Sequence, residues 1–461
     1  MNAKQWTLIK SGATPEVLTI PQFLSQRAVR HYHHASTTTT HQHPGTEEDR
    51  TALPVPLRVG LDPFVVAVTF PETLEHEFAK AATRDGIPMT TTIGTIDTTH
   101  STTNLIDAIW GEERPAVPVS PFRVHPLQFA GVTVAEKIAT IRQQMTQENT
   151  KATLAIFGTL DDVAYLCNLR ATGDIATCPV GIAYATVTDQ DTILYCDRAK
   201  MAASASVQDH LTAAAVTVRP YDAIVHDVQH HVQQSRDHTV WLDRTRSNYK
   251  LSSLVPPEQL LDAQNSITPM KAIKNTAELD GMRLAHAVDG AAMAKFMAWL
   301  DHEIRVLGRR ITEVDLDTKL TACRAEQPGF VELSFPTIAG VGSNGAIIHY
   351  SASNEKPELL QSLDSHQPIL IDSGGQYKYG TTDVTRTWYF GTVSDNNAAT
   401  TSSNTVVDDD YIDSYTRVLK GNIAVDTMIF PGMFTPFSSS VSLFFWRTGT
   451  IQKSFLCPSC S

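Results

Sequence analysis

Two aspartates in the segment ILIDSGGQYKYGTTDVTRTWYF constrain this chain more than any other feature of its sequence. Asp372 and Asp383 lie in β-prone flanks, and the glycines and tyrosines between them predict a hairpin turn at residues 377–380. With Tyr377 and Lys378 at the turn centre, the two aspartates are directly opposed, with Cβ atoms about 5 Å apart. A buried pair of like charges is destabilising unless one carboxyl is protonated or a cation lies between them. The spacing therefore favours a metal site, and two exposed loop aspartates are the alternative.

The length of the chain limits the number of domains, and its charge limits the kinds of partner. A chain of 461 residues exceeds what one hydrophobic core usually serves, roughly 250 to 300 residues, so two or three domains are expected. The 42% hydrophobic and 19% charged residues are typical of a soluble globular protein. A formal net charge of −12 argues against a nucleic-acid surface and offers no attraction to anionic lipid. The partner is expected to be a small molecule or a peptide.

Cysteine usage and hydropathy indicate the compartment. The six cysteines are scattered without framework spacing, which suits a reducing environment, and the single CxxC pair at Cys457 and Cys460 is interpreted as incidental. The first ten residues hold no signal-like apolar run, and no stretch of about eighteen apolar residues occurs. We expect a cytoplasmic protein without a membrane span.

The pattern along the chain predicts three domains, at about 1–129, 130–269 and 270–461. Residues 28–50, rich in Thr and His, are predicted to form an insertion without fixed structure. From about 130 the chain alternates between helical and strand patterns, which indicates α/β organisation. Helix-opening capping boxes are predicted at Asn275-x-x-Glu278 and Thr312-x-x-Asp315.

The last part of the chain is predicted to be rich in strands. After the second capped helix come four short β-like runs: Val331–Phe335, Ala346–Tyr350, Pro368–Asp372 and Thr382–Phe390. Beyond about residue 431 neither helical nor strand periodicity continues, and we expect that tail to be unrelated to what precedes it.

Several long segments of the chain resemble the eukaryotic, three-domain aminopeptidase P family. The catalytic domain of that family is matched by SFPTIAGVGSNGAIIHY, by the aspartate segment and by YTRVLKGNIAVDTMIFP. AIKNTAELDGMRLAH resembles the family's entry into that domain, and GTLDDVAYLCNLR and RVGLDPF resemble parts of its second and first domains. The resemblance runs from about Trp6 to Pro431, apart from insertions near 28–50 and 392–410.

This resemblance implies the fold and the site. The expected fold class is α/β and α+β, with creatinase-like amino-terminal α/β domains followed by a partial pita-bread metallopeptidase domain. In the family two metals, usually manganese, share an activated water that attacks the bond before a proline in the second position. By the resemblance Asp372 binds one metal, Asp383 bridges both, and His349 positions the substrate or moves a proton. A homodimer is also implied. Without the motif, His349 would be read as an ordinary core histidine.

The rest of the family's metal site has no counterpart here. The family uses two Asp, one His and two Glu, but no Glu follows Glu358 and no His follows His366. We therefore expect a chain that is truncated at both ends, holds two of five ligands and is inactive by itself. A related Xaa-Pro dipeptidase is one alternative, although the string YGTTDVTRT favours the aminopeptidase. A non-catalytic remnant serving as a binding or dimerisation module is the other.

Overall fold

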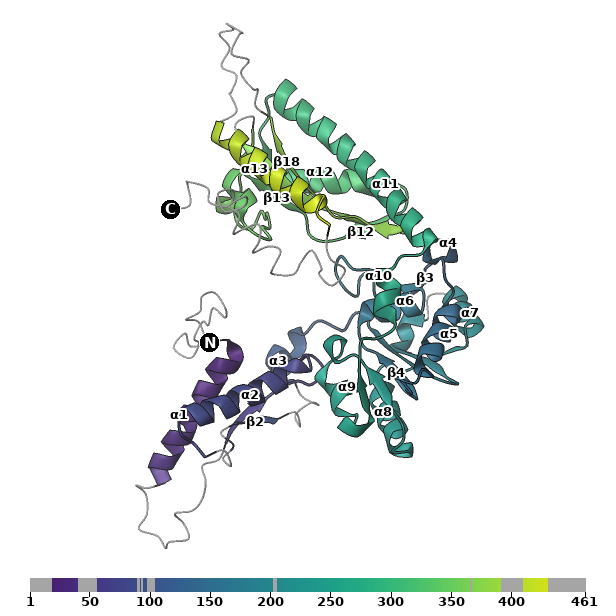
Figure 1. Ribbon diagram of the computed structural model, residues 1–461. Helices are drawn as coiled ribbons and strands as arrows, with labels where there is room; N and C mark the ends of the chain where they lie inside the picture. The colour runs from purple at the N-terminus through teal and green to yellow at the C-terminus, as the bar shows by residue number, and fades with distance from the viewer. Residues whose placement is uncertain are drawn as a thin grey trace. The chain divides into compact units, whose positions relative to one another are not determined.

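The computed structural model describes residues 19–39, 56–88, 92, 94–97, 104–201, 205–364, 367–390 and 409–429. The chain divides into two compact units, Met1–Gly281 and Met282–Ser461 (Figure 1). Each unit has buried hydrophobic clusters of its own. Over the described ranges, no helix combines the length and apolar character that crossing a bilayer requires. Helices and strands are mixed in both units, as the sequence predicts.

The first part of unit 1 is a pair of helices packed beside a small parallel sheet. Helices α1 (Ile20–Thr39) and α2 (Thr69–Arg84) share a core that includes buried Ala28, Leu74 and Phe78. Strands β1 (Leu57–Gly60) and β2 (Gly94–Asp97) pair in parallel. The prediction that residues 28–50 lack fixed structure is wrong for 28–39, which belong to α1. Residues 40–50 lie outside the described residues.

A six-stranded mixed sheet with helices on both faces forms the main body of unit 1. The strand order is β10-β9-β4-β6-β7-β8, with β4 at Leu154–Phe157. Alternate β4 residues face opposite layers, because Ala155 and Phe157 pack with α5 (Val134–Met145) whereas Leu154 and Ile156 pack with α8 (Ala223–Gln234). Figure 1 shows these helices on the two sides of the sheet. The predicted α/β organisation after residue 130 is confirmed.

The remaining elements of unit 1 are the other strands of this sheet and further helices, 3₁₀ turns and short strands of the same unit. They are α3 (Leu105–Trp110), η3 (Gly111–Glu113), β3 (Arg123–Val124), α4 (Leu127–Ala130), α6 (Leu160–Leu166), β5 (Leu169–Arg170), β6 (Ala183–Thr188), β7 (Thr192–Cys196), η4 (Arg198–Met201), α7 (Ala205–Ala213), β8 (Val216–Arg219), β9 (Val240–Leu242), η5 (Arg244–Arg246), α9 (Tyr249–Ser253), η6 (Pro257–Gln259), β10 (Leu260–Asp262) and α10 (Ile267–Ala272).

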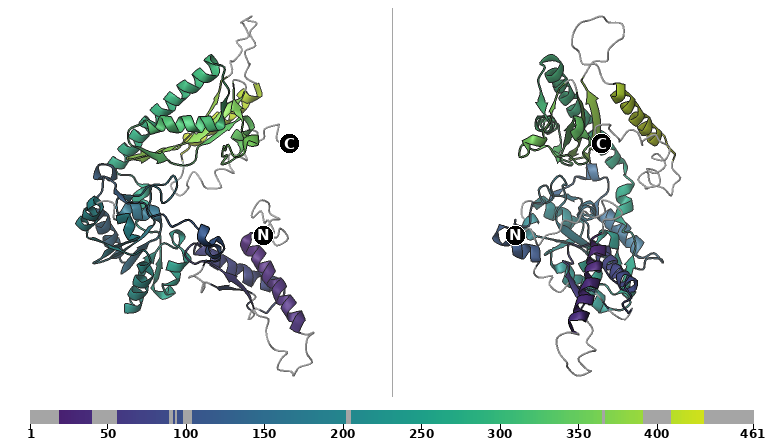
Figure 2. Two further views of the ribbon diagram at one scale, coloured as in Figure 1. Left: turned by 180° about the vertical axis from the view of Figure 1, so that it is seen from behind. Right: turned by 90° about the vertical axis from the view of Figure 1, so that its left-hand side faces the viewer.

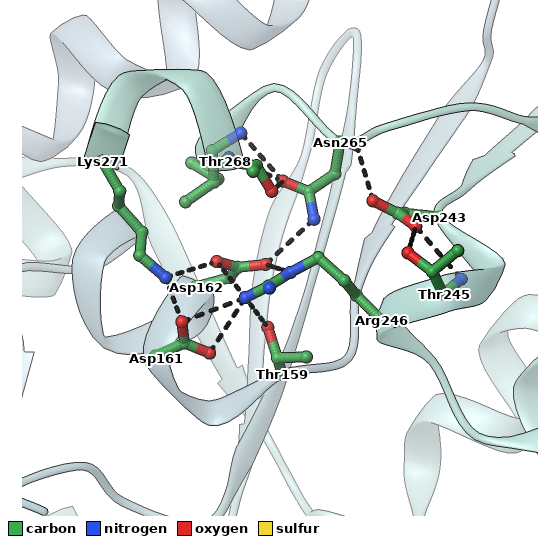
Figure 3. A network of polar contacts seen from close by, with 10 residues as sticks. Thr159, Asp161, Asp162, Asp243, Thr245, Arg246, Asn265, Thr268 and Lys271 are labelled. Carbon is green, nitrogen blue, oxygen red and sulfur yellow. Dashed lines mark hydrogen bonds and ion pairs between the residues drawn. The ribbon is translucent and has the colours of Figure 1, made fainter. Parts of the chain in front are cut away.

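The motif GTLDDVAYLCNLR supplies a charge network rather than a cavity (Figure 3). Asp162, fully buried, accepts from Arg246 Nε at 3.0 Å, from Lys271 Nζ at 2.9 Å and from Asn265 Nδ2 at 2.9 Å. Burial alone would raise the pKa of Asp162, but the bonds from Arg246 and Lys271 lower it. Asp161 pairs with the same two cations. The network joins the start of α6, η5 and α10, so this motif has a structural explanation.

Two capped helices build the core of unit 2. Helix α11 (Thr276–Asp301), which begins in unit 1, opens with Asn275 and Glu278 exchanging side-chain-to-backbone bonds of 2.9 and 3.0 Å. Helix α12 (Glu313–Ala325) opens with the predicted Thr312–Asp315 capping box. A π-helical turn, His302–Val306, follows α11. Figure 2 shows α11 and α12 over the strands of this unit, in agreement with their shared buried cluster.

Within its described residues, the strands of unit 2 form three small antiparallel sheets. The first contains β13 (Ile338–Val341), β15 (Pro368–Ser373) and β18 (Val384–Tyr389). The second contains β12 (Phe330–Leu333), β16 (Gly375–Tyr377) and β17 (Gly380–Thr381). The third pairs β11 (Ile311–Thr312) with β14 (Ser362–Leu363). Helix α13 (Asp409–Asp426) follows. The predicted strand at Ala346–Tyr350 is wrong: Gly342–Ala346 form a 3₁₀ turn, η8, and a second one, η9, covers Pro357–Leu359.

Candidate metal and substrate site

The hairpin that carries the two aspartates has its turn where the sequence predicts it, but with a different register. Tyr377 pairs with Gly380, which puts Lys378 and Tyr379 at the turn centre. Asp372 therefore lies opposite Thr385, not Asp383, and its Oδ1 accepts from Thr385 Oγ1 at 2.8 Å. The predicted direct opposition is wrong by two residues. Because side chains alternate between faces with a period of two, a two-residue shift leaves Asp372 and Asp383 on the same side.

Alternation along β15 explains which way Asp372 points. Ile369 and Ile371 are fully buried against α11 and α12, so Asp372, between Ile371 and Ser373, belongs to the opposite face. Ile338 of β13 is its cross-strand partner on that face. Both residues line a cavity of about 440 Å³. The face away from the helices therefore carries the candidate site.

The same cavity gathers all three residues that the sequence singles out. His349, Asp372 and Asp383 line it, together with an apolar wall of Phe335, Pro336 and Ile338 and with Tyr350 and Ser351. Asp383 and His349 are exposed, and Asp372 is half-buried. Two carboxylates, one imidazole and an apolar wall suit a ligand that has both a charged group and an apolar ring or side chain.

Close backbone contacts explain two glycines of the site motifs. A Cβ on Gly374 would lie 2.0 Å from the carbonyl oxygen of Thr382, so no other residue fits between Asp372 and the turn. A Cβ on Gly340 would lie 2.6 Å from the backbone nitrogen of Gly345, where η8 folds back on β13. These contacts hold the two segments that border the cavity.

Sequence reasoning missed the residue that anchors the segment bearing His349. Glu313, at the first position of α12, is fully buried and accepts from the Tyr350 hydroxyl at 2.7 Å and from the Val341 N–H at 2.7 Å. The Thr312 capping box revealed where the helix begins, but no spacing in the sequence links residue 313 to the segment 341–361. Burial, then the bond to Glu313, raises the pKa of Tyr350.

The two carboxylates that line the cavity, Asp372 and Asp383, suit a hard divalent cation but form only part of a site. Carboxylate oxygens are the ligands that manganese and magnesium prefer. Among the residues that the structure describes, no group of three or more His, Cys, Asp and Glu side chains is arranged to hold a metal. Asp372 and Asp383 can therefore contribute one wall of such a site.

Comparisons with known proteins agree with this geometry. Residues 113–278 match the creatinase/prolidase N-terminal domain, and residues 280–440, which contain the cavity, match metallopeptidase family M24. The chain is 32% identical over 431 residues to aminopeptidase P1 of Lotus japonicus, covering 81% of this chain and 60% of the relative. It is 37% identical over 358 residues to a probable Xaa-Pro aminopeptidase P of Paracoccidioides lutzii, covering 75% and 54%.

A solved structure extends the similarity to the fold. X-prolyl aminopeptidase from Caenorhabditis elegans, described as a cytosolic enzyme with a di-nuclear active site, superposes with a TM-score of 0.72 at 26% identity, over 94% of this chain and 60% of that one. The chain thus spans little more than half the length of these relatives. A creatinase-like amino-terminal domain followed by a pita-bread metallopeptidase domain accounts for the whole pattern, and the chain belongs to the aminopeptidase P group of the M24 metallopeptidases.

Proposed function

We propose that the chain is built around the chemistry of an Xaa-Pro aminopeptidase, the release of an amino-terminal residue that precedes proline. One observation carries the proposal: within the M24-matching region, His349, Asp372 and Asp383 border a single cavity. The names of its relatives support the substrate class, peptides with proline in the second position. The Xaa-Pro dipeptidase alternative acts on the same bond in shorter peptides.

Asp372 and Asp383 are the residues proposed to hold divalent cations, with manganese as the first candidate. The Thr385 hydroxyl bonds one oxygen of Asp372, which leaves the other oxygen for an ion and fixes the carboxylate's orientation. Bound divalent ions supply Lewis acidity to the scissile carbonyl. His349, exposed on the cavity, is proposed to hold the substrate or to carry a proton at an imidazole nitrogen.

We further propose that the chain alone does not turn over peptides. Two carboxylates cannot fix two ions, and the sequence offers no Glu beyond residue 358 for general-base work. The nematode structure is described as a cytosolic enzyme with a di-nuclear active site, which supports a cytoplasmic setting and a site for divalent cations as parts of this proposal. A homodimer remains part of the proposal on family resemblance.

Manganese titration by calorimetry tests the metal proposal. The parent chain is expected to bind with a Kd on the order of 10⁻⁴ to 10⁻³ M, the weak end for oxygen-ligand sites. Asp372→Asn and Asp383→Asn should each abolish this binding. Asp413→Asn serves as the matched control, because Asp413 is an exposed carboxylate paired with Arg417 on α13. Unchanged binding in both cavity variants would remove the proposal.

A peptide-cleavage assay tests the proposal that the chain alone does not turn over peptides. With excess manganese, the chain should cleave a proline-containing tripeptide no faster than an Asp383→Ala variant does. Turnover above that background would show that the two-carboxylate site suffices. Absence of both binding and turnover would favour the non-catalytic binding module instead.

A further inference from the structure

Glu313 is a buried carboxylate whose described donors are all neutral. Its side chain is 0% exposed, and it stands at the first position of α12, where the helix dipole favours a negative charge. Its Oε1 accepts from Val341 N–H at 2.7 Å and from Asn344 Nδ2 at 3.1 Å. Its Oε2 accepts from Tyr350 OH at 2.7 Å and from Gln361 N–H at 3.0 Å. Because both of its oxygens accept hydrogen bonds, this carboxylate is held rigidly in the core.

These donors come from the start, the middle and the end of one segment. Val341 ends β13, Tyr350 lies midway, and Gln361 directly precedes β14. Asn344 adds a cross-link, because its Nδ2 also donates to the carbonyl oxygen of Leu359 at 2.9 Å. The side chain of Glu313 is therefore bonded to the segment 341–361 at its start, in its middle and at its end.

His349 is the strained member of that segment. Its φ of +55° lies in the left-handed region, which costs a non-glycine residue on the order of 1 kcal/mol or more. Ile348 before it is 86% exposed and cannot hold it, whereas Tyr350 after it is 7% exposed and bonded to Glu313. The hydroxyl of Tyr350 thus anchors the residue next to the strained backbone.

We infer that Glu313 is a positioning residue: through Tyr350 and the backbone of 341–361 it maintains the left-handed conformation at His349 that brings the imidazole to the cavity shared with Asp372 and Asp383. The inference rests on the proposed function for the meaning of that placement. Glu313 itself does not line the cavity, so its effect passes through the segment.

Nuclear magnetic resonance of the full chain labelled with ¹³C-histidine tests this inference. The His349 ring signal is identified as the one missing from His349→Asn. In Tyr350→Phe, which removes one hydroxyl and keeps the buried ring, the His349 signal should move more than any other histidine signal, such as that of His231 in α8. Glu313→Gln should do the same, since the amide places a donor against other donors. Glu326→Gln is the matched control, because Glu326 caps the other end of α12 and is exposed.

The outcomes separate positioning from mere stability. Thermal unfolding of each variant shows which of them fold, and Tyr350→Phe decides the matter if Glu313→Gln does not. An unmoved His349 signal in folded Tyr350→Phe overturns the inference and leaves Glu313 a structural residue only. Added manganese gives an independent readout, since it should broaden the His349 signal in the parent and less so in Tyr350→Phe. If the parent signal is not broadened, the metal proposal fails, while the metal-free shifts still decide the role of Glu313.

Discussion

Breaking the buried ion pair between the two core helices of unit 2 should strongly destabilise that unit. Arg324 of α12 is fully buried and donates to Asp289 of α11 twice, from Nε to Oδ1 at 2.7 Å and from Nη2 to Oδ2 at 3.1 Å. Tyr377 of β16 donates its hydroxyl to Asp289 Oδ1 at 2.8 Å. The pair therefore ties both helices to the hairpin that carries the candidate site.

Replacing Asp289 with Ala is expected to lower the free energy of unfolding by about 3–5 kcal/mol, because it leaves a guanidinium buried without a counter-charge. Tyr377→Phe removes one bond to a charged acceptor and should cost about 1.5–3 kcal/mol. Combining Asp289→Ala with Arg324→Met should restore much of the loss, since Arg324 Nη2 already lies 3.7 Å from the sulfur of Met293, in surroundings that accept an apolar chain.

Hydrogen exchange in increasing urea, read by mass spectrometry on peptides from α11 and α12, measures these changes in the whole chain. Peptides from α8 provide the internal reference, because α8 belongs to the other compact unit. A loss below about 1 kcal/mol in Asp289→Ala, or a double variant less stable than Asp289→Ala alone, would refute the reasoning.

The same ion pair makes the stability of unit 2 depend on pH. Burial, the largest single influence, would raise the pKa of Asp289, but the hydrogen bond and charge of Arg324, with the bonds from Tyr377 and Thr382, together outweigh it and hold the pKa below the ordinary value of 3.8. The stabilisation is thus complete above about pH 4 and is lost as the pH falls through the lowered pKa of the folded state. Asp289→Ala should make unfolding less dependent on pH in that acidic range.

Two further predictions concern the backbone at His349 and the order of proteolysis. In urea, the free energy of unfolding of His349→Gly should exceed that of His349→Ala by about 1 kcal/mol, because φ at this position is +55°. At His286, an exposed residue inside α11, the Ala variant should instead be the more stable one. If the Gly variant were more stable at both sites, or the Ala variant at both, the backbone strain at His349 would be contradicted. Limited proteolysis should cut first beyond about residue 270 and leave residues 130–269 as the resistant part. The reason is that α13 exposes the apolar side chains of Ile412, Tyr415, Leu419 and Ile423. Survival of the 270–461 region as the most resistant fragment would contradict this prediction.

Locally encoded features were predictable from the sequence. The two capping boxes and the hairpin turn at 377–380 each depend on residues three to five positions apart, and all are confirmed. The register was not predictable, because contacts outside the hairpin set it. Tyr377 is held in the strand by Asp289 and packs edge-on against Phe330, while the Lys378 N–H donates to the carbonyl oxygen of Gly329. These contacts move the turn centre one residue along the chain.

Composition misled where tertiary packing decides the structure. The Thr- and His-rich stretch after residue 28 suggested a loop, yet it continues a helix because Ala28 and Val29 are buried with Leu74 and Phe78 of α2. The apolar pair Ile347 and Ile348 suggested a strand, yet both are exposed, and η8 folds back through the contact of Gly340 with Gly345. Glu313 was invisible for the same reason, since its partners lie 28 to 48 residues away.

The exposure of the two aspartates changes the argument for the metal. The sequence suggested a buried like-charge pair, which would require a cation to be stable at all. In the structure Asp383 is exposed and Asp372 is half-buried beside the Thr385 hydroxyl, so water can solvate both charges. Solvation weakens their repulsion, so the repulsion by itself does not require an ion between them. Repulsion between the two aspartates is therefore no support for a metal. The metal proposal rests on the cavity that both aspartates share with His349 and on the match to metallopeptidase family M24. Because little repulsion is relieved when an ion binds, these two carboxylates by themselves should hold it only weakly.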